Sequence, residues 1–595
     1  MGWICGTTAP VAPLGGRPLW QEETSSHRVW VVDDGDFPGV RTCESTDARL
    51  AVVGDAWVSE DELRRALLDV RREAWRFLTR WPGSYWVIAQ HRNRTVVLSD
   101  LAGARPVFHA RLRGEAVWAT EATPLAALTG ARTDHEAIVQ TMVTPDLGEL
   151  APLTTTFRGV RRVPGGHLFT VDDDAGSTRP YEPLGQGTPF ADGVDRFRDA
   201  LLGAVEVRVR NAGGLVSADT SGEDNTTSLG RLTVRRSPLL DPGIVAPLPA
   251  PAAFWDLERS PLTDQPFADA VRWPQLRDRY RRAASAGSAL HLVGSGRDQL
   301  LTAPVTALAD LAATGQHLAL WRASVTQARR RGLATHEVYR AGVLLARTSY
   351  SAALRELADG ITAPGRAAAR AISWLPPSGA AAWLTPAARV ATAAVVQGVA
   401  MRAHDIAIGM SARRIWDEVH LTGPRFAGLA AQAAAAGCAL SAPFLDNEVV
   451  RAALAVPVHE HLHLHQRTPL LTAALQAVGE EPVERGAGRA DDDGRLGVTG
   501  NLAAVRELLA GSELVAHGLL DARAIERDLE ALRADGAAGG AAGGPAADRG
   551  GGRREAARVT TVRALETLVS TELWLSRHRH VSAADLWETN VRVRC

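Results

Sequence analysis

Two apolar stretches of this chain each run directly into a loop rich in glycine, serine or threonine. The first is "GLVSADTSGEDNTTSLG" at residues 214–230, and the second is "ALHLVGSGRDQLLTAP" at residues 289–304. Helical sequence surrounds both stretches, and strands that alternate with helices predict a parallel sheet of the α/β class. Because loops at the carboxyl ends of parallel strands gather at one edge of the sheet, we expect these two loops to lie together.

Both loops have the composition of an anion site. Small polar residues in a strand-to-helix turn present backbone N–H groups and hydroxyls at a helix N-terminus, where an anion is favoured. In the second loop Gly294 and Gly296 allow close backbone approach, and Asp298 is a candidate ligand for Mg²⁺. Two plainer interpretations stay open: the first loop is an ordinary polar turn, and Asp298 is the N-cap of the helix that follows.

Composition narrows the class of protein. A chain of 595 residues with 46% hydrophobic and 22% charged residues is typical of a globular protein of several domains. A net charge of -1 argues against nucleic acid and anionic membranes as partners, and all 66 basic residues are arginine. The four cysteines are scattered, no signal peptide is recognisable and the most apolar run is alanine-rich, so we expect a cytoplasmic protein without a membrane span.

The sequence divides into two parts. Short strand signals fill residues 1 to about 175 and predict an antiparallel sheet domain with helices, one of them capped by Ser59. A polar, Pro- and Gly-rich stretch then predicts a boundary at 175–190. We therefore predict domains at 1–180 and 190–595, the second with a flexible Gly/Ala-rich insert at about 535–555.

Several motifs, in their order along the chain, resemble one known superfamily. "VLSDLAGARPVF" is similar to a D-x-x-G-x-x-P-L-Y strand pair, and "LVGSGRDQLL" to a G-x-G-G-D loop that follows a strand. "LSAPFLDNEVV" is close to a PFLD segment, and "HQRTPLLTAAL" to a K-x-x-L-R helix. Over nearly its whole length the chain resembles the asparagine synthetase superfamily, most of all the lasso-peptide cyclases and the related β-lactam synthetases.

This resemblance implies an ATP-dependent, AMP-forming amide ligase with Mg²⁺. In lasso-peptide cyclases a side-chain carboxylate of a precursor peptide is adenylated, and the peptide's own N-terminal amine closes a macrolactam. The implied partners are the ribosomally made precursor peptide, a leader-peptide-binding protein and a leader peptidase. Residues 1–180 resemble a glutamine amidotransferase domain of the N-terminal-nucleophile type. That domain is expected to be inactive, because Cys5 is internal and is read as a small buried hydrophobe.

The resemblance also implies roles for individual residues. It predicts that Asp298, Ser295 and Arg489 are catalytic residues and that Asp298 and Asn225 are metal ligands. Binding of ATP and pyrophosphate falls on the following residues: Ser221, Gly222, Asn225, Thr226, Thr227 and Gly294.

Four positions depart from the family pattern, and all four lie in the nucleotide site. Glu223 and Arg297 stand where glycines are usual, Asn225 replaces an aspartate, and Arg489 replaces a lysine. The stretch between Ser228 and Asp298 also lacks a clear second strand. An alternative function therefore stays open, namely a catalytically degenerate homologue that acts as a peptide- or partner-binding scaffold. A true asparagine synthetase is disfavoured, because the N-terminal cysteine that it requires is missing.

Overall fold

The structure of the chain is a computed structural model. It describes every residue outside the following ranges: 1, 21–26, 33–38, 149, 151–154, 173–174, 184–186, 219–251, 364–371, 404–408, 462–465, 480–496, 540–550, 579–581 and 590–595.

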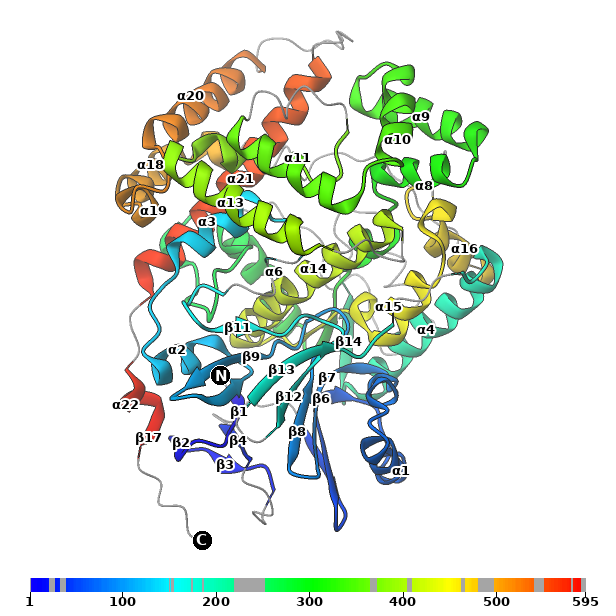
Figure 1. Ribbon diagram of the computed structural model, residues 1–595, viewed down its shortest axis with the longest axis vertical. Helices are drawn as coiled ribbons and strands as arrows, with labels where there is room; N and C mark the ends of the chain where they lie inside the picture. The colour runs from blue at the N-terminus through cyan, green and yellow to red at the C-terminus, as the bar shows by residue number, and fades with distance from the viewer. Residues whose placement is uncertain are drawn as a thin grey trace.

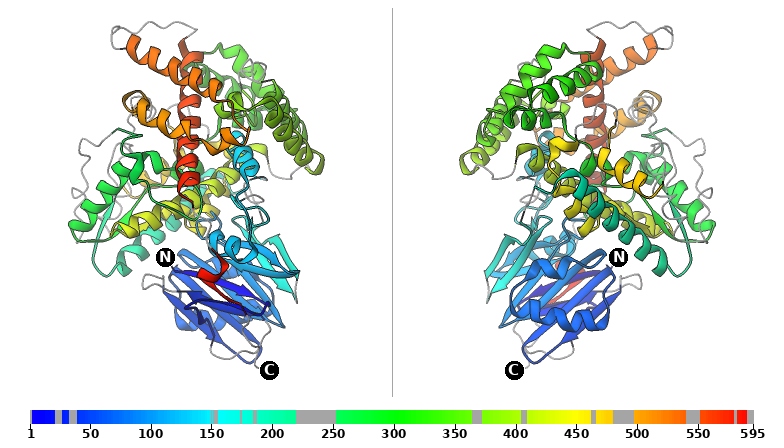
Figure 2. Two further views of the ribbon diagram at one scale, coloured as in Figure 1. Left: turned by 90° about the vertical axis from the view of Figure 1, so that its left-hand side faces the viewer. Right: turned by 90° about the vertical axis from the view of Figure 1, so that its right-hand side faces the viewer.

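The amino-terminal part forms two antiparallel sheets that lie face to face (Figure 2). Within the described residues, the strands of the first sheet are, in spatial order, β11 (Arg161–Arg162), β9 (Phe108–Leu112), β10 (Glu115–Ala119), β1 (Trp3–Thr7), β4 (Arg28–Val32) and β3 (Arg17–Pro18). Those of the second are β13 (Ala175–Pro180), β12 (His167–Asp172), β8 (Arg94–Leu98), β7 (Gly83–His91), β6 (Ala48–Ala56) and β5 (Val40–Glu44).

A separate hydrophobic core holds these two sheets together. Ile4 and Trp118 of the first sheet pack in one cluster with Ile88 and Phe169 of the second, and all four are almost fully buried. Because strand side chains alternate between the faces of a sheet, the apolar residues that recur at every second position of these strands supply this inner layer.

Three helices accompany the sheets: α1 (Glu60–Arg71), α2 (Ala122–Thr129) and α3 (His135–Val143). The expected N-cap of the first helix is confirmed. The Ser59 side chain accepts a hydrogen bond from the backbone N–H of Glu62, whose carboxylate in turn accepts the backbone N–H of Ser59. This reciprocal capping satisfies two N–H groups that the helix itself leaves without a partner.

A parallel sheet follows in the second part of the chain. After α4 (Phe190–Asn211), the described strands β14 (Leu215–Ala218), β15 (Ser288–Leu292) and β16 (Leu440–Ser441) pair in parallel, with β15 in the centre. Together with the antiparallel sheets and the many helices, this sheet confirms the α/β class expected from the sequence. In the described part of the connection between β14 and β15, residues 252–287 form helical turns and α6 (Trp273–Ser285) but no strand.

Helices make up most of the remaining chain (Figure 1). They are α7 (Arg297–Leu301), α8 (Leu308–Ala313), α9 (His317–Arg331), α10 (Thr335–Leu345), α11 (Tyr350–Thr362), α13 (Pro386–Arg402), α14 (Met410–Ala435), α15 (Asn447–Leu454), α16 (Pro469–Ala477), α18 (Leu502–Ala510), α19 (Glu513–Ala516), α20 (Ala522–Gly539), α21 (Gly551–Arg577) and α22 (Ala583–Leu586).

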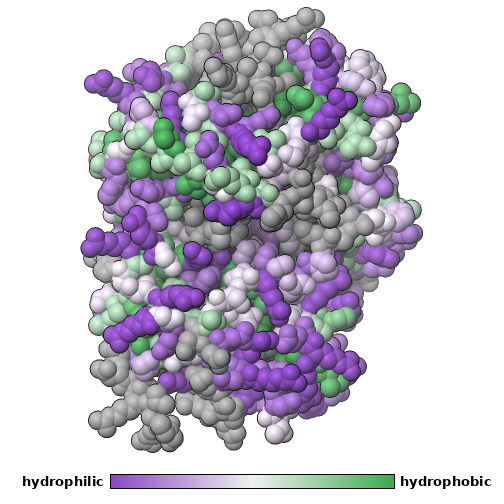
Figure 3. Space-filling view, in the orientation of Figure 1, coloured by the Kyte–Doolittle hydropathy of each residue, from purple (hydrophilic) through white to green (hydrophobic). Residues whose placement is uncertain are grey.

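Among the described helices, none combines the length and the hydrophobicity needed to cross a bilayer. On the face shown in Figure 3, hydrophobic residues are most frequent over the helical upper half, and hydrophilic residues dominate the lower half that contains the sheets. The predicted insert coincides with the end of α20 and the start of α21, and residues 540–550 of it lie outside the described residues.

The last described strand returns to the start of the chain. β17 (Trp587–Thr589) pairs antiparallel with β2 (Val11–Pro13). The rings of Trp587 and Trp3 lie with their centroids 5.3 Å apart, and the Trp587 indole N–H donates to the carbonyl of Pro124 at 2.9 Å.

Candidate active site

The second Gly-rich loop lies where the sequence predicts it, at the carboxyl end of the central parallel strand. β15 ends at Leu292, the chain turns through Gly294–Gly296, and α7 begins at Arg297. Gly296 has a φ of 90°, and a Cβ built there would lie 2.3 Å from Leu445 Cδ2 of the PFLD segment. The loop therefore packs this closely only because this position is glycine.

The first loop leaves the sheet at the same edge. Ala218, the last residue of β14, pairs with Leu292, the last residue of β15. All the residues of that loop that are predicted to bind ATP lie outside the described residues; they are Ser221, Gly222, Asn225, Thr226 and Thr227. The catalytic candidate Arg489 also lies outside them. The structure thus brings Gly294, Ser295 and Asp298 into one turn and leaves the roles of all nine predicted residues as predictions.

Asp298 faces two arginines. Its Oδ1 accepts hydrogen bonds from Arg297, with the guanidinium nitrogens 3.0 and 2.9 Å away, and its Oδ2 lies 3.7 Å from the guanidinium of Arg467. Gly296 is the N-cap of α7 and Asp298 lies inside its first turn, so the alternative that Asp298 caps this helix is wrong. Arg297, the residue that replaces the family's glycine, thus lies against the carboxylate beside it.

The charge around this carboxylate is positive. Two guanidinium groups surround one carboxylate, and the Asp298 side chain keeps 27% of its surface exposed. An exposed guanidinium such as that of Arg467 attracts a polyphosphate and repels a bare cation. Arg467 therefore fits the phosphates of ATP, whereas the Arg297 side chain is only 8% exposed, and a Mg²⁺ ion bound by Asp298 would have to displace at least one arginine.

A buried hydroxyl–imidazole cluster beneath the loops was not anticipated from the sequence. Ser217 Oγ of β14 lies 2.8 Å from His291 Nδ1 and 2.7 Å from Ser288 Oγ, both on β15. His291 is fully buried, and the ring of Tyr280 stands edge-on to it with the centroids 5.9 Å apart. The cluster joins the two strands whose loops form the site, and the lone histidine inside the apolar run "ALHLV" was its only sequence signal.

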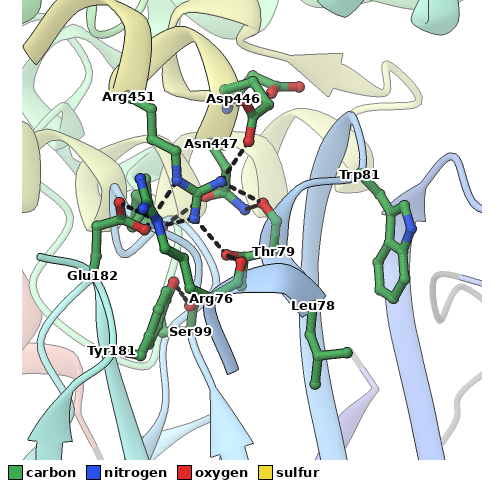
Figure 4. Close-up of polar contacts among 12 residues, drawn as sticks. Arg76, Leu78, Thr79, Trp81, Ser99, Tyr181, Glu182, Asp446, Asn447 and Arg451 are labelled. Atoms are coloured by element: carbon green, nitrogen blue, oxygen red, sulfur yellow. Dashed lines mark hydrogen bonds and ion pairs between the residues drawn. The ribbon is translucent and has the colours of Figure 1, made fainter. Parts of the chain in front are cut away.

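The PFLD segment connects the site to the amino-terminal sheets. Figure 4 shows the sheet side of this junction, where Asp446 and Asn447 lie beside Thr79. Asp446, at the N-cap of α15, is 1% exposed, and its Oδ2 accepts the backbone N–H of Gly83 at 2.7 Å and the Arg208 guanidinium at 2.9 Å. The next residue, Asn447, accepts the backbone N–H of Leu101 at 2.8 Å. The segment that contacts Gly296 is therefore tied by buried hydrogen bonds to Gly83 at the start of β7 and to Leu101 in the turn after β8.

One helical turn further on, Arg451 extends the same junction. Its guanidinium donates to the carbonyl and hydroxyl of Thr79 at 2.9 and 2.6 Å, and to Glu182 at 2.7 Å. Tyr181 donates its hydroxyl to the carbonyl of Ser99 at 2.7 Å, and burial raises the pKa of this phenol. Neighbouring groups of opposite charge satisfy one another here, as buried charges require.

The expected burial of Cys5 is confirmed. Cys5 lies in β1 between Trp30 and Ala119, is fully buried, and has its thiol pKa raised by that burial. A protonated thiol without access to solvent cannot act as a nucleophile.

Comparison with known proteins identifies one family. The asparagine synthase family matches residues 249–576, which is more than half of the chain and begins downstream of the first loop. A search of curated proteins found no match.

Among solved structures, the glutamine phosphoribosylpyrophosphate (PRPP) amidotransferase from B. subtilis complexed with ADP and GMP is 11% identical with a TM-score of 0.19. That alignment covers 49% of this chain and 74% of the other. A structure described as the allosteric regulatory enzyme of purine biosynthesis is 11% identical with a TM-score of 0.18, over 51% and 70% of the two chains. TM-scores this low do not establish a shared fold.

Proposed function

Since the chain belongs to the asparagine synthase family of ATP-dependent amide-forming ligases, we propose that it closes a macrolactam in a ribosomally made precursor peptide. The acid is an Asp or Glu side chain of that peptide, and the amine is the peptide's own N-terminus. Support for this choice within the family comes from the sequence motifs that resemble the lasso-peptide cyclases. The buried Cys5 also offers no nucleophile for releasing ammonia from glutamine.

The observation that carries the ligase proposal is the turn at Gly294–Asp298. It combines a glycine-dependent approach to the PFLD segment with two arginines over one partly exposed carboxylate, at the edge where the first loop also leaves the sheet. The positive charges of Arg297 and Arg467 would stabilise the negative charges of the β- and γ-phosphates and of the departing pyrophosphate.

The reaction consists of two transfers. A carboxylate oxygen of the peptide attacks the α-phosphorus of ATP, the bond to the bridging oxygen of the β-phosphate breaks, and pyrophosphate leaves. The N-terminal amine then attacks the acyl carbon, the acyl–oxygen bond breaks to release AMP, and the amine gives up a proton. Holding the amine against the activated acyl group contributes up to about 7–11 kcal/mol in favourable cases.

Mg²⁺ would supply further positive charge to the polyphosphate, with Asp298 and Asn225 as the predicted ligands. Arg297 and Arg467 both contact the Asp298 carboxylate, so at least one of them would have to move before Asp298 could bind such an ion.

The test is calorimetric titration of Mg·ATP into the purified chain, followed by pyrophosphate release with a candidate precursor peptide. We expect ATP to bind and the product peptide to be lighter than the substrate by one water. Absence of ATP binding at millimolar nucleotide would overturn the ligase proposal. Binding and pyrophosphate release without a cyclised product would overturn only the macrolactam.

Replacement of Asp298 tests the site itself. Asp298→Ala should abolish turnover, because it removes the carboxylate that orients both arginines. Asp359→Ala, at an exposed position of α11, is the matched control and should retain activity. Full turnover by the Asp298 variant would show that the catalytic assignment is wrong.

A second candidate function is a catalytically degenerate scaffold that binds the peptide or a partner protein. It is favoured by Arg297, which replaces a glycine and lies against Asp298, and by Glu223 and Asn225 in the first loop. If Glu223→Gly together with Asn225→Asp creates turnover that the natural chain lacks, the scaffold is the better description.

The proposed partners of either function are the precursor peptide, a leader-peptide-binding protein and a leader peptidase. Co-purification from a strain that expresses all three would test them.

A further inference from the structure

Two histidines and a glutamate from distant parts of the sequence meet where α3 approaches α19. Figure 1 shows these two helices. His135 is the first residue of α3, Glu513 is the first residue of α19, and His517 follows the last turn of α19. His135 Nε2 lies 3.1 Å from Glu513 Oε2, and the imidazole rings of His135 and His517 stack with their centroids 4.0 Å apart. In the part of the chain that the structure describes, this is the group whose donors are placed to hold a metal ion.

The spacing of the donor atoms suits a small tetrahedral ion. One ligand atom from each of the three residues lies within 4.8 Å of the other two. In a tetrahedral zinc site with bonds of about 2.0–2.1 Å, ligand atoms are about 3.3 Å apart. The distance of 3.1 Å between the His135 and Glu513 atoms already matches one edge of that tetrahedron. The ligand atom of His517 lies within 4.8 Å of both, so His517 would complete the tetrahedron by a shift of no more than about 1.5 Å.

The surroundings allow that shift and hold the other two ligands. His517 is exposed, so its ring can turn without repacking the core, and the side chain of His135 is only 17% exposed. The start of α19 is anchored by Glu572, which is 2% exposed and accepts the backbone N–H of Glu513 at 3.0 Å. Glu513 therefore begins from a fixed backbone position, and its carboxylate keeps 44% of its surface open to an arriving ion.

We propose that His135, Glu513 and His517 form a binding site for Zn²⁺ or a similar divalent transition metal. Two imidazoles and one carboxylate are ligands that zinc accepts, and three protein ligands leave the fourth position for water or a ligand from outside. Mg²⁺ is a poor occupant, because it demands oxygen ligands in an octahedron. The ion would join α3, which lies between β10 and β11 in sequence, to α19 in the carboxyl-terminal helical part. This proposal does not depend on the proposed ligase activity.

The experiment is a zinc titration of untagged, full-length protein against a competing chromogenic chelator, with bound metal measured after dialysis. The sequence also carries histidines at 459, 461, 463 and 465, so the same titration is made on a chain with His459, His463 and His465 changed to Gln. We expect that variant to keep one equivalent of zinc. In the same background, His135→Ala, Glu513→Gln or His517→Ala should weaken this binding at least about tenfold, since even outer partners of a metal site are worth that much.

His336→Ala, an exposed histidine of α10, is the matched control and should bind zinc like its parent. Zinc should also raise the Tm of the parent and not that of the His517→Ala variant, whose exposed side chain contributes little to folding. Loss of all zinc binding in the chain with the three glutamines would overturn the proposal, as would affinity in the His135 and His517 variants equal to that of their parent. Displacement of the zinc by millimolar Mg²⁺ would also contradict it.

Discussion

Asp298 and Asp446 are both aspartates that face an arginine beside the parallel sheet, and they differ in where their partners come from. Asp298 is held by the arginine next to it in sequence and by the half-exposed Arg467, and it keeps 27% of its surface open. Asp446 is 1% exposed. It accepts hydrogen bonds from an arginine of α4, from a backbone N–H in the first turn of its own helix α15, and from a backbone N–H of β7, 363 residues away in sequence. A partly exposed carboxylate with an exposed arginine beside it can give up that arginine to a ligand, whereas a buried carboxylate fixes the position of its neighbours.

The largest effect expected from this contrast is on stability. Asp446→Ala leaves the buried Arg208 without its charge partner and should lower the free energy of unfolding by about 3–5 kcal/mol. Asp298→Ala should lower it by less, because that carboxylate is partly solvated, although the change also removes a charge partner of Arg297, whose side chain is 8% exposed. Urea unfolding of both variants checks the comparison, and equal losses would show that the two sites do not differ in this way.

An intermediate effect is expected from His420, which lies in α14 against the amino-terminal sheets. Burial lowers the pKa of His420 to about 3, with help from His167 and Arg162 nearby. Below the ordinary histidine pKa of about 6.5, His420 is protonated in the unfolded chain and stays neutral in the folded chain. The stability contribution is therefore complete above pH 6.5 and is lost as the pH falls toward 3, with a slope of up to about 1.4 kcal/mol per pH unit.

His420→Gln should flatten this slope between pH 6.5 and 5 in a series of urea titrations. His336→Gln, at an exposed position of α10, serves as the control and should leave the slope of the parent. A slope that is identical in the His420 variant and the parent would contradict this assignment.

The smallest effect on stability is expected at Arg467. Arg467→Ala should change the free energy of unfolding by less than about 1 kcal/mol, because its side chain is 50% exposed and 3.7 Å from Asp298. Its effect on nucleotide affinity should be larger, about tenfold, since a hydrogen bond to a charged group contributes about 1.5–3 kcal/mol. Calorimetry with Mg·ATP measures the affinity, and Arg467→Lys should recover part of it. Unchanged affinity in the alanine variant would remove Arg467 from the site.

What the sequence could predict follows from the range over which each interaction acts. The Ser59 cap and the turn at Gly294–Gly296 depend on residues a few positions apart, so local patterns reveal them. That the two loops lie at the same edge of the sheet could also be predicted from the sequence, because parallel strands end on the same side of a sheet.

The junction around Asp446 was not accessible in this way. PFLD was recognised as a motif, but nothing local to it indicates that its aspartate accepts the N–H of Gly83 or that Arg451 pairs with Glu182. Choice of partner over hundreds of residues is set by how the two parts of the chain pack. The contact of Arg297 with Asp298 was missed for another reason: two adjacent charges on a helix meet only in particular rotamers, which composition does not specify.

The pairing of β17 with β2 bears on how this protein is made. A ribosome delivers residues 11–13 hundreds of residues before residues 587–589, yet the two segments share one ladder and the Trp587 indole lies against Trp3. The strand β2 is therefore made without its partner and stays unpaired until β17 has been synthesised. During that interval the nascent chain is exposed to strand exchange with other chains, and a chaperone that shields β2 would protect it.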